Sequence, residues 1–131
     1  MGGMSQSLSS EPFTRLECLG LLERADVARV LLSLGSLPAA MPARIELVEH
    51  DHLVISSRAN AVLVAARRGD VISVQIDGLG PDNNIWSVTV TGIAASAPPN
   101  AIAPEHVKRT PDPRATLILL PLSVVRGQRE H

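Results

Sequence analysis

The stretch Ile85–Ser96, IWSVTVTGIAAS, carries the clearest alternation of apolar and polar residues in this chain of 131 residues. Successive side chains of a β-strand point to opposite faces, so a period of two predicts a strand with one buried face. The alternating positions divide into an apolar face and a hydroxyl face: Trp86, Val88 and Val90 against Ser87, Thr89 and Thr91.

Five further segments have the aliphatic composition of strands and end at turn residues. They span residues 28–34, 39–48, 53–57, 70–77 and 115–125. Pro42 and Pro121 interrupt two of these segments, and each needs an edge position or a bulge because proline donates no backbone hydrogen bond. Six β segments without a regular strand–helix–strand alternation predict an antiparallel, barrel-like sheet.

Two short helices are expected among the strands, at residues 15–24 and 60–68. Thr14 and Glu17 have the spacing of a capping box, in which each side chain accepts a hydrogen bond from the other residue's backbone amide. Gly69 follows the second helix and provides a glycine stop.

The rest of the chain divides into a tail and one domain. Residues 1–9 have no pattern of a signal peptide and are expected to be a disordered tail, which leaves residues 10–131 as a single domain. Residues 97–113 are rich in proline and include a third, short helical turn expected at 104–108.

Composition excludes several classes of function. The formal net charge is −1 and aromatic residues make up 2% of the chain, so there is little to attract or stack on a nucleic acid. No apolar run approaches the roughly 20 residues that span a bilayer. The single cysteine, Cys18, fits a reducing cytoplasm, and a buried apolar setting suits it best. His50 and His52 flank an aspartate without further ligands at zinc spacing, so no metal site is expected.

The order of these elements resembles the small, actinobacterial-type members of the pyridoxamine 5′-phosphate oxidase-like superfamily, which are flavin-binding split β-barrels. The matching stretches extend over roughly residues 13–129, and their order is more specific than any one of them. They are residues 17–22 (ECLGLL), 37–48, 68–71 (RGDV), 86–92 (WSVTVTG) and 125–129 (VRGQR). The resemblance implies a six-stranded antiparallel split β-barrel with two or three short helices.

The resemblance also implies where a cofactor would lie. In such proteins the flavin occupies a groove between two subunits, and its phosphate meets the third strand and the start of the following short helix. In such proteins a strand also runs along the flavin ring and a tryptophan lies near the cofactor. The residues of this chain at all of these positions are Pro42, Ala43, Arg44, Ser56, Ser57, Arg58, Asn60, Ala61, Val62 and Trp86. Hydroxyls and helix N-terminal amides suit an anion.

The implied function is a cytoplasmic homodimer that binds FMN, or the deazaflavin F420, and passes hydride or electrons to a small organic substrate. Many relatives open the short helix with a Ser-Lys pair, whereas this chain has Ala61 and Val62. That departure favours an alternative, a barrel of the same fold that carries no cofactor or does not turn its ligand over. Ser56 and Ser57 equally suit a plain strand end, Arg44 and Arg58 a solvated surface, and Trp86 a core or dimer contact. No catalytic residue stands out.

Overall fold

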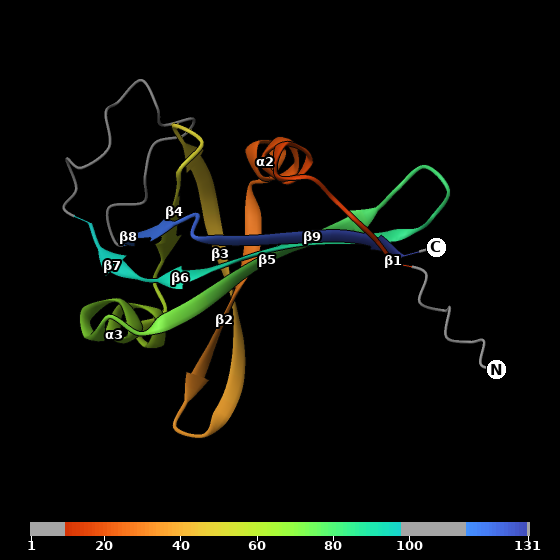
Figure 1. Cartoon of the computed structure of the whole chain (residues 1–131). Coiled ribbons are helices and arrows are strands. Elements are labelled where there is room, and N and C mark those ends of the chain that lie inside the picture. The colour runs from red at the N-terminus through yellow and green to blue at the C-terminus, as the bar shows by residue number, and fades with distance from the viewer. Residues whose placement is uncertain (1–9, 98–114, 131) are drawn as a thin grey trace.

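The computed structural model describes residues 10–97 and 115–130 of the chain (Figure 1). This part of the chain is mainly β, as the sequence predicts, and contains nine strands and two helices. In chain order they are β1 (Ser10–Pro12), α2 (Arg15–Arg24), β2 (Val27–Leu34), β3 (Leu37–Val48), β4 (His52–Ser57), α3 (Asn60–Arg68), β5 (Val71–Leu79), β6 (Ile85–Ile93), β7 (Ala95–Ser96), β8 (Thr116–Pro121) and β9 (Val124–Glu130). The expected tail at residues 1–9 and the expected helical turn at 104–108 lie outside the described residues.

The nine strands form one antiparallel sheet in the order β1-β9-β6-β5-β2-β3-β4-β8-β7. Among the described strands the sheet is open, because β1 pairs with β9, β7 pairs with β8, and neither outer strand pairs with the other. The sheet nevertheless curls on itself, and a Cβ added to Gly92 in β6 would lie 3.0 Å from the carbonyl oxygen of Pro121 in β8. The expected count of six strands is not confirmed.

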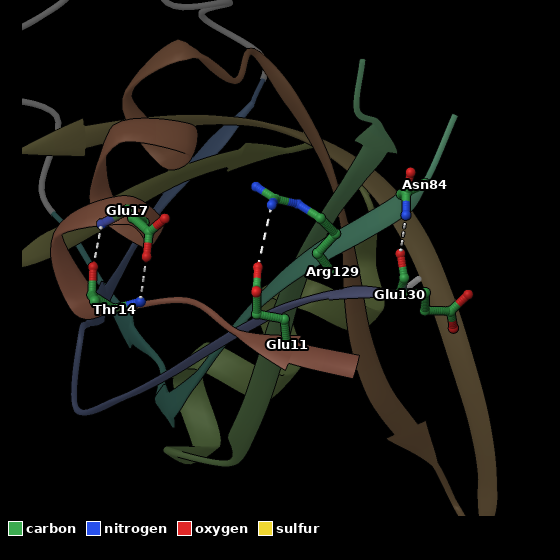
Figure 2. Close-up of polar contacts among 6 residues, drawn as sticks. All are labelled: Glu11, Thr14, Glu17, Asn84, Arg129 and Glu130. Atoms are coloured by element: carbon green, nitrogen blue, oxygen red, sulfur yellow. Dashed lines mark hydrogen bonds and ion pairs between the residues drawn. The ribbon is translucent and has the colours of Figure 1, made fainter. Parts of the chain in front are cut away.

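Two of the additional strands, β1 and β9, lie near the two ends of the described chain, and the third arises because the expected strand 85–96 divides into β6 and β7. The expected strand 115–125 divides after Pro121, and residues 124–130, which extend beyond the end of that expected strand, form β9 between β6 and β1. Polar contacts hold this arrangement in place (Figure 2). Arg129 donates to Glu11 across the β1–β9 pair at 3.3 Å, and the Asn84 side chain donates to the carbonyl oxygen of Glu130 at 2.7 Å.

The predicted capping box at the start of α2 is confirmed (Figure 2). The Glu17 amide donates to the Thr14 hydroxyl at 3.2 Å, and the Thr14 amide donates to the Glu17 carboxylate at 2.9 Å. These hydrogen bonds lower the pKa of Glu17, because they favour its charged form. The buried face of the helix carries Cys18 and Leu22. Cys18 packs against β9 at Gly127, where an added Cβ would lie 2.6 Å from the sulfur.

The predicted glycine stop at the end of α3 is also confirmed. Gly69 has a φ of 69°, a left-handed conformation that favours glycine, and its amide donates to the last carbonyls of the helix. The face of α3 that points into the protein is formed by Val62, Ala65 and Ala66.

The core lies on the inner face of the curled sheet and is built from aliphatic side chains. The alternation predicted for β5 and β6 holds, because the buried positions there are Ile72, Val74, Ile76, Val88 and Val90. Trp86 is half-buried and packs against this core. Its ring lies over Gly78 of β5, where an added Cβ would be 2.7 Å from a ring carbon.

No helix in the described part of the chain is long and apolar enough to span a membrane.

Candidate functional site

A surface pocket lies where β2, β3 and β4 run side by side. Its volume is about 280 Å³, and it is lined by Val27, Pro42, Ala43, Arg44, Ser56, Ser57, Arg58 and Ala115. Six of the ten residues singled out in the sequence therefore meet in one place. Sequence reasoning did not find the other two lining residues, Val27 and Ala115, because small apolar side chains give no chemical signal.

The register of the sheet explains why distant residues meet in this pocket. Arg44 of β3 lies opposite Val27 of β2 on one side and opposite Ser56 of β4 on the other. Directly opposed residues point to the same face, so these three side chains share one row across three strands. Pro42 pairs with β2 through Arg29, and the pairing with β4 begins only at Arg44, so the predicted edge position of Pro42 is confirmed.

Ser57 is the most constrained polar group of the pocket. It is the one buried polar side chain among the described residues, at 7% exposure. Its Oγ accepts a hydrogen bond from the Ala59 amide at 3.0 Å, which fixes the turn between β4 and α3. A serine hydroxyl both accepts and donates, so its proton is left to donate to another group.

The charges of the pocket are all positive. Arg44 and Arg58 are its only charged lining residues, and both are exposed. Two guanidinium groups beside two hydroxyls form a donor set that suits a phosphate or carboxylate, because charge-assisted hydrogen bonds to such groups are the strong ones.

The start of α3 contributes less than the sequence suggested. Asn60 is exposed and Ala61 is half-buried, but Val62 is 0% exposed and belongs to the hydrophobic core. None of the three lines the pocket. The N-cap residue, Ala59, makes no side-chain capping hydrogen bond, so the first amides of this helix lack the usual side-chain acceptor.

Trp86 lies apart from the pocket. It pairs with Gly78 on one side and Arg129 on the other, and it is not among the residues that line the pocket. The structure therefore places it against the core, at the β5–β6–β9 part of the sheet.

His50 and His52 each lie near one acidic side chain. His52 lies 3.0 Å from the Asp51 carboxylate, and His50 lies 3.9 Å from that of Glu23. Within the described ranges no three histidine, cysteine or acidic side chains gather closely enough to hold a metal ion.

An open, curled antiparallel sheet with a positively charged pocket at its β2–β3–β4 rows defines a small, mainly β protein with one candidate ligand site in the described part of the chain. The family model described as pyridoxamine 5′-phosphate oxidase matches residues 14–114, and the chain belongs to that family. No curated protein matches the chain.

Solved structures with a similar fold include several flavin-binding proteins. An FAD-binding protein from Mesorhizobium loti is 18% identical with a TM-score of 0.76, over 93% of this chain and 99% of its own. The FAD-binding protein from Mycobacterium smegmatis is 15% identical with a TM-score of 0.76, over 92% and 100%. An FAD- and heme-binding protein of the latter organism is 17% identical with a TM-score of 0.70, over 94% and 74%. At these identities the likeness concerns the fold.

Proposed function

We propose that the protein binds a flavin nucleotide, with the phosphate end of the nucleotide in the pocket between Arg44 and Arg58. The observation that carries the proposal is the pocket itself, which brings together six residues that the family resemblance assigns to flavin binding. Its two positive charges and two hydroxyls match the charge and the acceptor oxygens of a phosphate. Family membership and the flavin-binding proteins of similar fold support the same ligand class.

The size of the pocket limits how much of the ligand it holds. Its volume of about 280 Å³ is slightly below the range for small-molecule sites, about 300–1,000 Å³. It would enclose the phosphate end and leave the ring system on the adjoining surface of β3, beside Pro42 and Ala43. We propose that this surface becomes a groove in a homodimer of split barrels.

The proposed activity is that of an oxidoreductase in the cytoplasm that passes hydride or electrons to a small organic substrate. A bound flavin would supply the redox chemistry, whereas the protein binds and orients it. In the proposed roles, Arg44 and Arg58 hold the phosphate electrostatically and Ser56 and Ser57 donate hydrogen bonds to it. FMN, FAD and a deazaflavin share the phosphate, so this set of residues accommodates each of them.

A protein of the same fold without a cofactor is the second candidate. The observation that favours it is Val62, which stands where many relatives have a lysine and which contributes its side chain to the core. Without that lysine, the affinity for phosphate depends on arginines that are exposed to solvent and therefore screened.

The two candidates are separated by titrating the purified protein with FMN, FAD and deazaflavin, followed by fluorescence and by melting temperature. We expect saturable binding of at least one of them. Arg44→Ala should weaken it about 10- to 100-fold, because a hydrogen bond to a charged group contributes about 1.5–3 kcal/mol. Arg24→Ala, which removes an exposed arginine at the end of α2, is the matched control and should leave binding unchanged. Failure of all three flavins to bind would favour the cofactor-free alternative.

A further inference from the structure

One arginine outside the pocket, Arg29 of β2, lies beside the surface on which the ring end of the ligand is proposed to rest. It is directly opposite Pro42 of β3, and both residues are exposed on the side of the sheet away from the core. Directly opposed side chains share one face of a sheet, with Cβ atoms about 4.5–5.5 Å apart. Arg29 is the only charged residue of β2, so it sets the charge of this surface next to Pro42.

Arg29 is placed differently from the two arginines of the pocket. Arg44 lies opposite Val27, two positions before Arg29, so Arg29 and Arg44 are diagonal neighbours, about 7–8 Å apart. Because β3 lies between β2 and β4, Arg58, which follows β4, is on the other side of Arg44. The positive charge of the site therefore extends from the phosphate end, at Arg44 and Arg58, to the ring end at Arg29.

The charge of Arg29 is balanced by one acidic residue. Its guanidinium donates to the carboxylate of Asp77 in β5, and the two side chains are 48% and 41% exposed. Ion pairs at such exposure contribute little to stability, so a ligand can share this arginine at little cost to the fold. A guanidinium carries five N–H donors, enough to hold Asp77 and a second acceptor at the same time.

We propose that Arg29 stabilises negative charge on the ring end of the bound flavin, and that Asp77 sets how strongly it does so. This inference rests on the proposed function, in which Arg44 and Arg58 hold the phosphate. Uptake of a hydride, which is two electrons and one proton, leaves the neutral ring with one negative charge. A protein charge beside the ring therefore changes its redox potential. Arg29 favours the reduced form over the oxidised form.

Titration of the full chain with FMN and with riboflavin, each oxidised or reduced with dithionite, tests the inference. Riboflavin has the ring end without the phosphate. Arg29→Gln should weaken the binding of both reduced flavins about 10-fold more than that of the oxidised forms. For a two-electron couple a tenfold change corresponds to about 30 mV, so the redox potential of bound FMN should fall by about 30 mV. Arg44→Ala should instead weaken FMN and leave riboflavin unchanged.

Asp77→Asn separates the charge effect from a loss of structure. It removes the same ion pair as Arg29→Gln but leaves the positive charge, so the redox potential of bound FMN should rise, whereas it falls in Arg29→Gln. Loss of the ion pair alone cannot produce shifts of opposite sign, because both variants lose it. Arg29→Lys keeps the charge and should keep most of the parent's redox potential. Circular dichroism should show all variants folded.

The matched control is Arg126→Gln, at an exposed arginine of β9 in the same row of the sheet. Arg126 lies opposite Thr89, Thr89 opposite Gln75, and Gln75 opposite Arg29. Three strand spacings of about 4.8 Å place it roughly 14 Å from Arg29 along the sheet. This exceeds the Debye length of about 8 Å at a salt concentration of about 0.15 M, so the control should leave binding and potential unchanged.

Several results would overturn the inference. Equal redox potentials in the parent, Arg29→Gln and Arg126→Gln would do so while leaving the proposed function intact. So would shifts of the same sign in Arg29→Gln and Asp77→Asn. An Arg29→Gln variant that binds FMN more weakly but riboflavin unchanged would assign Arg29 to the phosphate end. If neither flavin binds the parent in either oxidation state, the proposed function fails, and the inference fails with it.

Discussion

Val62→Lys is the substitution for which sequence and structure make opposite predictions. By resemblance, a lysine here would restore a phosphate ligand at the start of α3. In the structure Val62 is 0% exposed and packs in the core with Ala65 and Ala66, so the new ammonium group would be buried among apolar side chains. The structure therefore predicts a loss of stability in place of a gain in affinity.

The magnitude of this loss follows from the lysine pKa. Burial lowers the pKa of a lysine by about 3 to 5 units from about 10.4, and each unit corresponds to about 1.4 kcal/mol. At pH 7 the folded chain would hold the amine neutral, at a cost of about 4 to 5 kcal/mol. That is comparable to the whole stability of a small domain, about 5–15 kcal/mol.

The sign of the pH dependence makes the prediction specific. Between the lowered pKa of the folded state and about 10.4, the unfolded chain binds the extra proton and the folded chain does not, so stability rises with pH. From pH 7 to pH 9 the variant should recover about 3 kcal/mol relative to the parent. Urea unfolding at both pH values measures this difference.

Two matched variants separate charge from volume. Val62→Met has similar length without the charge and should show no such pH dependence. Asn60→Lys introduces the same charge at an exposed position two residues earlier and should be nearly neutral for stability. If Val62→Lys instead has a stability difference from the parent that is constant from pH 7 to pH 9, the amine reaches water and the core placement of Val62 is wrong.

Four further predictions concern the packing and the capping of α2. Gly127→Ala should destabilise the fold by about 1–3 kcal/mol in urea unfolding, because the new methyl group would overlap Cys18. Gly20→Ala should stabilise the fold by about 0.5–1 kcal/mol in the same measurement, because no atom of another element lies within 4 Å of the added carbon. Cys18 should react slowly with a thiol reagent at pH 8 in the native state and rapidly in urea, because burial raises its thiol pKa; equal rates would contradict its burial. Thr14→Ala should cost about 1 kcal/mol by loss of the cap. Because the cap lowers the Glu17 pKa, its contribution is present above the usual carboxyl pKa and declines as the pH falls through the lowered value, so the difference between parent and variant should shrink in acid.

The features that were predicted correctly from the sequence depend on interactions between residues that are close in the chain. The capping box at Thr14 and the glycine stop at Gly69 act within a few residues, so they set the limits of α2 and α3 whatever surrounds them. The period of two in β5 and β6 likewise fixed which side chains face the core. Six of the residues that line the pocket were predicted from the family resemblance. No physical pattern in the sequence marks these six residues as a site.

Tertiary structure decided what depends on pairing between distant segments. β9 forms because residues 124–130 find β6 and β1 on either side, a contact that their polar composition does not reveal. Val27 enters the pocket only because the register places it opposite Arg44. Val62 lies in the core because α3 packs the face formed by Val62, Ala65 and Ala66 against the sheet, a contact with segments that are distant in the chain. Interactions between residues that are close in the sequence can be predicted from the sequence alone. The register between strands depends on how the whole sheet assembles.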